Sequence, residues 1–243
     1  MITVVIPTFN EGKFIGILLE SLAIQTVPED LEIVVADNRS VDDTCIVAER
    51  FRARFARLLI VEGGTPAVGR NKGAAASSGN PIFFIDADVR LVDRVLIAKS
   101  VLYFRSRHLA VATIRLQPRS RRWVDQLMVG AYNLLLWPAM FVRPMGSMCI
   151  VADRSAFEAV GGYPEDVAMA EDHDFVLRCA KTGRYRIIPG RAEFNVRRLE
   201  KEGRFNLLRK YIHVTLVRLW RGPVTEFRYD FGCFTHDLES PSD

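Results

Sequence analysis

Residues 81–88 read PIFFIDAD, and this stretch decides the fold. The apolar run Ile82–Ile85 is typical of a buried strand. The carboxylates of Asp86 and Asp88 follow at the exit of that strand, two residues apart, so they can converge on one hard cation such as Mg²⁺ or Mn²⁺. A polar turn after a strand would have the same composition, and only the context can separate the two interpretations.

Outward from this stretch, apolar runs that suit strands alternate with amphipathic runs that suit helices. Strands are predicted at 3–6, 31–36, 58–61 and 81–85, and helices at 14–22, 46–51 and 70–76. Asn10 is predicted to cap the first of these helices, and Ser40 with Asp43 to form a capping box at the second. The alternation predicts a parallel, doubly wound sheet, in which ligands bind beyond the carboxyl ends of the strands.

The second half of the chain is less regular. Strands are predicted at 109–116 and 147–152, helices at 123–141 and 170–182, and a basic, then amphipathic segment after residue 189. The length of 243 residues suits one large α/β domain with a tail, and such a domain needs no disulfides to hold its core. The four cysteines form no Cys-x-x-Cys pair, which favours reduced thiols in a cytoplasmic protein over a zinc cluster.

The net charge of +4 reflects arginines that gather at 105–122 and 184–221. Nucleic acid, anionic lipid headgroups, a phosphorylated substrate or simply solvent could face these arginines. Nucleic acid is disfavoured because no aromatic residues are interleaved with them in a repeated pattern. No secretory signal is recognisable, and no apolar run reaches the roughly 18–20 residues of a membrane span. The uncharged run 126–142 comes closest, and its proline favours an interfacial helix, a buried helix or a dimer contact over a spanning one.

Several motifs, taken in order, resemble the family 2 glycosyltransferases of the GT-A fold. They are VVIPTFNE at 4–11, VADNRSVDDT at 35–44, GRNKG at 69–73, DAD at 86–88, GGY at 161–163 and EDHDFVLR at 171–178. The resemblance covers about residues 2–188. It implies a GT-A type α/β fold with a doubly wound, mostly parallel sheet flanked by helices and a C-terminal helical tail. It divides the chain into a glycosyltransferase domain at 1–190, with a nucleotide-sugar half at 1–90 and an acceptor half at 91–190, and a basic amphipathic tail at 191–243.

The resemblance also implies a donor site. Its residues would be Pro7, Thr8, Asn10, Glu11, Asp37, Arg70, Asp86, Ala87 and Asp88. Among these, Asp37 would accept a hydrogen bond from a uracil-type base, and Arg70 would approach the diphosphate or ribose. Asp88, assisted by Asp86, would bind Mn²⁺ or Mg²⁺. The alternatives are a turn residue for Asp37 and a surface salt bridge for Arg70.

On the acceptor side, Asp172 matches the catalytic base of the family, and the resemblance implies inversion at the anomeric carbon. A sugar hydroxyl needs a base to take its proton, and a metal would stabilise the leaving diphosphate. The neighbouring Glu171 and Asp174 are expected to raise the pKa of Asp172 by repulsion. Alternatively, these acids only favour a helix N-terminus, and an acceptor that is already a lipid phosphate would need no base.

The implied function is transfer of a sugar from a UDP-linked donor to a lipid-linked or glycan acceptor, at the cytoplasmic face of a membrane. Two departures from the family pattern stand out: Ala36 replaces an acidic residue, and a further metal ligand stays unassigned between His213 and His236. A dehydrogenase would need Gly-x-Gly-x-x-Gly where residues 7–12 read PTFNEG. A catalytically degenerate GT-A protein that acts as a membrane-associated scaffold is the remaining alternative.

Overall fold

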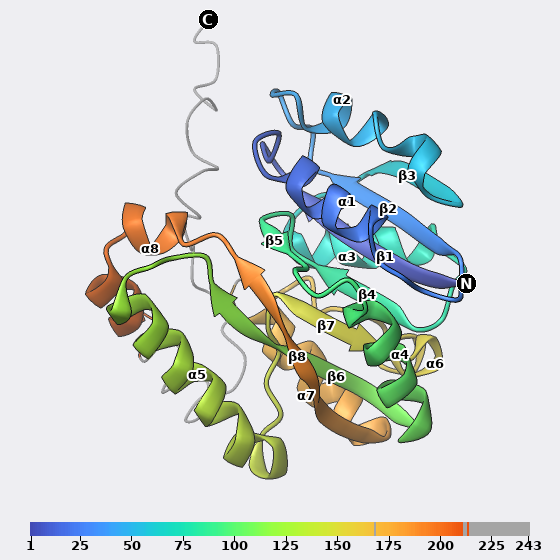
Figure 1. The fold of residues 1–243 in the computed structure, drawn as a ribbon. Helices are drawn as coiled ribbons and strands as arrows, with labels where there is room; N and C mark the ends of the chain where they lie inside the picture. The colour runs from blue at the N-terminus through green and yellow to red at the C-terminus, as the bar shows by residue number, and fades with distance from the viewer. Residues whose placement is uncertain (168, 211–212, 214–243) are drawn as a thin grey trace, which may run out of the picture.

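The computed structural model describes residues 1–167, 169–210 and 213. One eight-stranded sheet runs through them in the order β3-β2-β1-β4-β7-β6-β8-β5 (Figure 1). The strands are β1 (Ile2–Thr8), β2 (Leu31–Asp37), β3 (Arg57–Glu62), β4 (Ile82–Ile85), β5 (Val89–Arg90), β6 (Leu109–Pro118), β7 (Cys149–Ala152) and β8 (Arg184–Phe194). The helices are α1 (Ile15–Ala23), α2 (Thr44–Glu49), α3 (Pro66–Ala75), α4 (Leu96–Ser106), α5 (Trp123–Val142), α6 (Arg154–Ala159), α7 (Glu171–Thr182) and α8 (Arg197–Lys201), with a 3₁₀ turn at Arg52–Arg54.

Most neighbouring strands run parallel, which confirms the predicted class of sheet. The exceptions are β7, antiparallel to β4 and β6, and β5, antiparallel to β8. Strand β1 lies between β2 and β4 and is parallel to both, with Thr8 opposite Asp37. Because β4 ends directly before Asp86, the carboxyl ends of three parallel strands bring polar side chains to one edge of the sheet.

The sheet curls between β4 and β5. Only residues 86–88 separate these two strands along the chain, yet four strand spacings separate them in the sheet order. Four spacings in a flat sheet would need about 19 Å, whereas the chain from residue 85 to 89 spans at most about 14 Å. The sheet therefore bends back on itself, and the two aspartates lie where its two halves meet.

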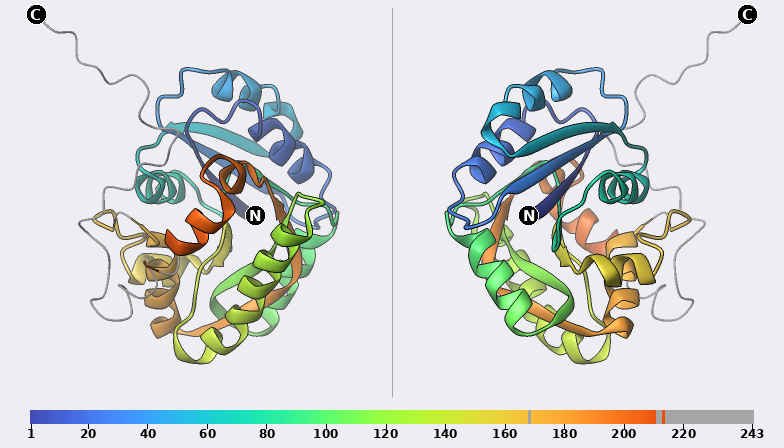
Figure 2. Two further views of the ribbon diagram at one scale, coloured as in Figure 1. Left: turned by 90° about the vertical axis from the view of Figure 1, so that its left-hand side faces the viewer. Right: turned by 90° about the vertical axis from the view of Figure 1, so that its right-hand side faces the viewer.

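Helices cover both faces of the sheet (Figures 1 and 2). On one face, side chains of α1, α4 and α5 pack with Val4 and Ile6 of β1, and on the other, side chains of α3, α6 and α7 pack with Val5. Neighbouring residues of β1 thus enter opposite cores. This is why its sequence is a continuous apolar run and does not alternate with polar residues.

An aromatic cluster fixes the loop at residues 161–163 beneath the sheet. Tyr163 stacks on Phe175 of α7 at 3.9 Å between ring centroids and meets Phe84 of β4 edge-on at 5.0 Å. Gly162 has a φ of +75°, and a Cβ there would lie 2.5 Å from the side-chain oxygen of Asn71. The Asn71 side chain in turn bonds the backbone N–H and carbonyl of Tyr163. Glycine lets this loop contact α3 closely enough for that exchange.

Two predicted helix starts are wrong. Helix α1 begins at Ile15, and Asn10 lies earlier with a φ of +53°, where its side chain accepts a hydrogen bond from the Val41 N–H. Helix α2 begins at Thr44, and the Ser40 hydroxyl donates to Asp37 and takes no part in a capping box. In both places a polar side chain links two loops, and that tertiary contact replaces the local cap.

Sequence patterns did not predict α4 or β8. Strand β8 contains Pro189 and Gly190, and its pairing with β6 shifts register between Ile188 and Arg191. It continues to Phe194, past the predicted domain boundary at 190. Helix α5 runs without a break through Pro138. No helix within the described ranges is long and apolar enough to cross a membrane.

Candidate active site

Two loops at the carboxyl ends of β1 and β2 form the first part of the site. The Thr8 hydroxyl donates to Asp37 Oδ1 at 2.9 Å, and the Ser40 N–H donates to Asp37 Oδ2 at 2.8 Å. The Asn10 N–H donates to the Ser40 hydroxyl at 2.8 Å. The Asp37 side chain is buried, and it accepts from the Ser40 N–H as a turn residue does, but it does not cap the next helix, which begins at Thr44. The bonds preorganise this wall of the site.

A second group of side chains gathers three carboxylates, from Glu11 after β1 and from Asp86 and Asp88 after β4. Burial raises the pKa of Asp88 to about 7; the charge of Asp86 adds to this shift and that of Arg197 opposes it. Burial also raises the pKa of Glu11, and its Oε2 is buried without a hydrogen-bond partner among the described residues. The raised pKa values show that burial and mutual repulsion outweigh the nearby positive charge, and a bound cation would relieve that repulsion.

Arg70 links the two halves of the site. Its guanidinium donates to Asp86 Oδ1 at 2.8 Å and to Glu171 Oε1 at 2.7 Å, and it lies 5.1 Å from the centre of the Tyr163 ring. Burial alone would lower the pKa of Arg70, but the two carboxylates raise it. The side chain is only 7 % exposed, so the alternative of a surface salt bridge is wrong. Arg70 is the buried counter-ion that these two acids share.

Asp172 lies in the first turn of α7, beside Arg70 and Glu171. Its Oδ2 is 3.2 Å from His173 Nδ1, the atom that also accepts the Gly146 N–H. Burial would raise the pKa of Asp172, but His173 and Arg70 outweigh burial and lower it to about 2. The expected upward shift is wrong because the interactions of Asp172 with His173 and Arg70 outweigh burial. A Cβ at residue 146 would lie 2.7 Å from the Asp172 carbonyl, so glycine lets this loop pass over the helix start.

The predicted site residues thus occupy one edge of the sheet. Pro7 lies within β1 and Ala87 is buried, so both contribute backbone more than side chain. Arg197, at the start of α8, was missed. Arg197 donates to Glu11 and lies 3.5 Å from Asp88. A correct prediction of β8 would have indicated it, because this arginine follows shortly after the end of that strand. His213 is exposed, and His236 lies outside the described residues.

The described part of the chain holds no group of three or more His, Cys, Asp or Glu side chains placed to bind a metal ion. This chain can instead offer two carboxylates, those of Asp86 and Asp88. Mg²⁺ and Mn²⁺ usually take one or two carboxylates and complete their shell with water and substrate phosphates. The oxygen donors and the unpartnered Glu11 Oε2 fit such an ion.

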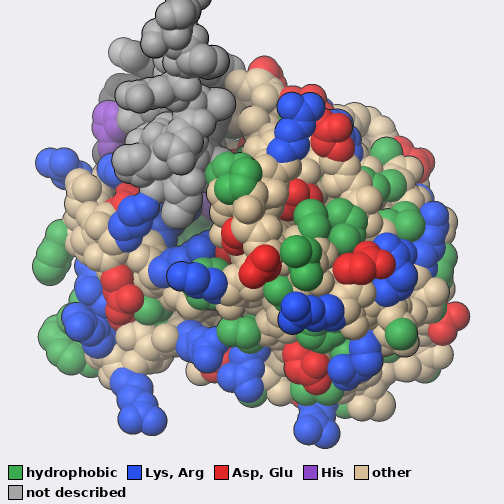
Figure 3. All heavy atoms as spheres, turned by 90° about the horizontal axis from the view of Figure 1, so that it is seen from above, with side chains coloured by type: hydrophobic (Ala, Val, Ile, Leu, Met, Phe, Trp, Pro, Cys, Tyr) green, Lys and Arg blue, Asp and Glu red, His purple; other side chains and the backbone are tan. Residues whose placement is uncertain are grey.

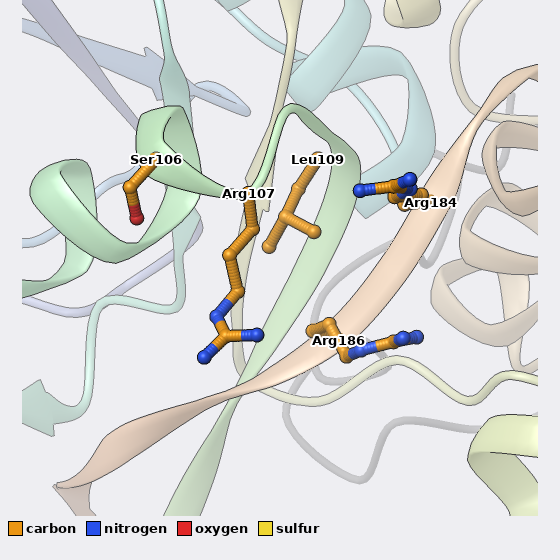
Figure 4. A pocket seen from close by; sticks show the side chains of 5 residues that line it. All are labelled: Ser106, Arg107, Leu109, Arg184 and Arg186. Atoms are coloured by element: carbon orange, nitrogen blue, oxygen red, sulfur yellow. The ribbon is translucent and has the colours of Figure 1, made fainter.

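A basic pocket lies at the other edge of the sheet, at the amino ends of β6 and β8. It is lined by Ser106, Arg107, Leu109, Arg184 and Arg186 (Figure 4). The Arg107 and Arg186 side chains point away from each other, so they do not converge on one anion. Elsewhere, Lys and Arg side chains are spread over the face in Figure 3 with acidic side chains between them. Neither feature gathers converging side chains as the carboxyl edge of the sheet does.

Comparison with known proteins decides the family. The sequence model described as Glycosyl transferase family 2 matches residues 3–141, more than half of the chain. The chain belongs to glycosyl transferase family 2. The family 2 match begins in β1 and ends within α5, so it includes the Thr8–Asp37 loops, Arg70 and both aspartates after β4.

Relatives and solved structures agree with this assignment. The family 2 chain is 25% identical over 187 residues to the poly(ribitol-phosphate) beta-N-acetylglucosaminyltransferase TarS of Staphylococcus aureus, covering 72% of this chain but only 32% of TarS. It is 27% identical over 186 residues to a PGL/p-HBAD biosynthesis glycosyltransferase of Mycobacterium bovis, covering 74% of this chain and 69% of that one. The chain thus spans about a third of the length of TarS.

Among solved structures, the mannosyltransferase PcManGT from Pyrobaculum calidifontis, in complex with GDP-Man and Mn²⁺, superposes with a TM-score of 0.72 at 25% identity, covering 89% of this chain and 61% of that one. S. aureus TarS 1-349 with UDP-GlcNAc gives a TM-score of 0.65 at 22% identity, covering 80% and 58%. The expected GT-A fold is confirmed for this family 2 chain.

Proposed function

We propose that this chain transfers a sugar from a nucleotide-sugar donor, UDP-linked, to a lipid-linked or glycan acceptor, with inversion at the anomeric carbon. The observation that carries the proposal is the cluster of Glu11, Asp86 and Asp88, which is short of positive charge and lies where parallel-sheet enzymes bind nucleotides. A protein kept only as a scaffold would have no need of such a cluster, because buried like charges destabilise the fold.

The wall around Asp37 would hold the nucleoside. Asp37 accepts three hydrogen bonds from Thr8 and Ser40, and a carboxylate has about four acceptor positions. The Cys45 thiol also hydrogen-bonds Asp37, so in this proposal the imide N–H of a uracil base would take the acceptor position that Cys45 shares. The UDP-GlcNAc complex of TarS is consistent with this nucleotide, whereas PcManGT carries GDP-Man.

Asp88 and Asp86 would hold Mn²⁺ or Mg²⁺, and the ion would supply charge stabilisation for the leaving diphosphate. The two aspartates cannot serve it equally. Asp86 already accepts from Arg70 at 2.8 Å, whereas Arg197 Nε lies 3.5 Å from Asp88. Asp88 is therefore the principal ligand in this proposal, and Asp86 assists.

Asp172 would take the proton of an acceptor hydroxyl as the sugar is displaced. A pKa of about 2 keeps its carboxylate ionised at neutral pH, and its side chain is 22 % exposed, so an acceptor can reach it. His173 and the Gly146 loop hold the helix start in place around it. Because so weak a base has a low affinity for the proton, its contribution to the rate would depend mainly on its position beside the acceptor hydroxyl.

Helix α5 supports a place at the cytoplasmic face of a membrane. Its outer side carries a row of large apolar side chains at helical spacing: Trp123, Leu127, Leu134, Trp137 and Phe141, each more than half exposed. Exposed arginines at 119, 121 and 122 precede the helix. Tryptophan suits the headgroup level, and each arginine near an anionic surface contributes about 1 kcal/mol. The predicted second amphipathic segment, 211–220, lies outside the described residues apart from the exposed His213.

Donor hydrolysis and transfer measured over a panel of UDP- and GDP-sugars, with Mn²⁺ and with chelator, test the proposal. We expect turnover of a UDP-sugar that stops in chelator. If no nucleotide sugar is turned over or shifts the thermal midpoint with Mn²⁺ present, the chain is the degenerate scaffold.

A further inference from the structure

Arg197 occupies a position between the carboxylates of the site. It is the first residue of α8, its Nη2 donates to Glu11 Oε1, and its Nε lies 3.5 Å from Asp88 Oδ2. The guanidinium also lies over the Phe14 ring at 4.3 Å from the centroid. Three contacts from two loops thus fix its position at the mouth of the site.

The backbone holds Arg197 in register with Asp88. Strand β5, which directly follows Asp88, pairs with the end of β8 through Val89 and Phe194. Beyond that pair, the Asn195 N–H donates to the Asp88 carbonyl at 3.2 Å. Only Val196 separates Asn195 from α8, so the arginine has little freedom to move away from the aspartate.

Charge and exposure distinguish Arg197 from Arg70. Glu11, Asp86, Asp88 and Glu171 surround these two guanidinium groups, so the cluster carries more negative than positive groups. Arg70 is 7 % exposed and lies between Asp86 and Glu171, whereas Arg197 is 34 % exposed. Of the two, Arg197 is the one that an arriving anion can reach.

We infer that Arg197 binds the diphosphate of the donor, beside the divalent cation and from the side of Glu11 and Asp88. The inference rests on the proposed function. A guanidinium matches the spacing of phosphate oxygens and stays charged at every relevant pH. Because the surrounding carboxylates outnumber the arginines, Arg197 supplements the cation and does not replace it.

The test distinguishes binding of the phosphates from binding of the base by comparing UDP with uridine. Affinities of UDP and of uridine are measured by calorimetry and ligand-observed NMR, with Mn²⁺ and in chelator, for the wild type, Arg197→Gln and Arg197→Lys. Arg198→Gln is the matched control, because Arg198 is the next residue on α8 and pairs with Glu202 at 3.1 Å. Arg197→Gln is expected to weaken the affinity for UDP about 10- to 100-fold, as for loss of a charged hydrogen bond, and to leave the affinity for uridine unchanged.

The loss should be larger in chelator than in Mn²⁺, and Arg197→Lys should recover part of it, since lysine keeps the charge but lacks the planar fork. Arg198→Gln should match the wild type. If wild-type protein binds UDP and Arg197→Gln leaves the ratio of UDP to uridine affinity unchanged, the inference is wrong while the proposed function stands. If the glutamine variant unfolds, an Arg197→Lys protein with wild-type UDP affinity in chelator refutes it. Wild-type protein that binds no UDP with Mn²⁺ present refutes both.

Discussion

Replacing Arg70 by methionine should destabilise the protein strongly and in a pH-dependent way. The change leaves Asp86 and Glu171 without their shared cation, and removing one partner of a buried ion pair costs about 3–5 kcal/mol. Because the Asp86 side chain is 31 % exposed and water can reach it, the lower end of about 3 kcal/mol applies. Because methionine keeps contact with the Tyr163 ring, the loss of unfolding free energy reports the missing charge more than any lost packing.

The pH dependence follows from Glu171. Burial already raises its pKa above the unfolded value, and Arg70 holds that shift down. A raised folded pKa means that the stability contributed by the protonated group is present at low pH and is lost as pH rises through the folded pKa. Without Arg70 the pKa rises further, so the cost of the substitution should be larger at pH 7.5 than at pH 5.

Urea unfolding at both pH values measures this directly, and a cost of about 3 kcal/mol corresponds to a fall in Tm of roughly 6–12 °C for a chain of this size. Arg39→Met is the matched control. It breaks the exposed Arg39–Glu62 pair, which is worth at most about 1 kcal/mol. If Arg70→Met costs no more than Arg39→Met, or costs the same at pH 5 and pH 7.5, Arg70 is not the shared counter-ion described here.

Four further predictions concern the site and its surroundings. Asp88→Asn should abolish most turnover and leave Tm unchanged or higher, since burial disfavours the ionised form; full activity of this variant in excess chelator would contradict the metal role. Asp172→Asn should bind UDP normally and lose about 10²- to 10⁴-fold in kcat, and a rate near that of the wild type would point to a phosphate acceptor. Asp37→Ala should weaken UDP binding by calorimetry more than it slows transfer, and an unchanged Kd rejects its role in reading the base. Trp137→Glu should reduce salt-sensitive sedimentation with anionic liposomes, whereas Leu102→Glu, exposed on α4, should not; equal pelleting of both variants argues against α5 as the contact.

Much of the first half of the chain could be predicted because its information is local. Continuous apolar runs at β1, β2 and β4 are each followed by a polar residue, and parallel pairing alone brings those residues to one edge. Asp37, Asp86 and Asp88 therefore followed from strand ends, without knowledge of any contact, whereas Thr8 followed only from the family resemblance. Helix starts were less predictable, since Asn10 and Ser40 form hydrogen bonds between loops about 30 residues apart, and a cap and a cross-loop bond use the same residue types.

The electrostatics of the site could not be predicted from sequence spacing. Glu171 and Asp174 flank Asp172, which suggested repulsion, but His173 and, 102 residues earlier, Arg70 lower the pKa of Asp172 instead. Arg197 escaped notice for a similar reason: the strand before it, β8, contains Pro189 and Gly190, and its partner Glu11 is 186 residues away. Both arginines act through pairings that only the folded chain creates.

The curl of the sheet has a consequence for how such a scaffold can diversify. Residues 86–88 are tied on one side by the Asp86 N–H to the Met148 carbonyl and on the other by the Asn195 N–H to the Asp88 carbonyl. The long excursion between β6 and β7 begins after Pro118, and its first part, residues 119–142 with α5, contains neither of these tie points, whereas Met148 lies at its end. Insertions, deletions or exchange within residues 119–142 therefore leave both ties of the aspartates in place. Evolution can alter what α5 touches while the turn at residues 86–88 is inherited unchanged.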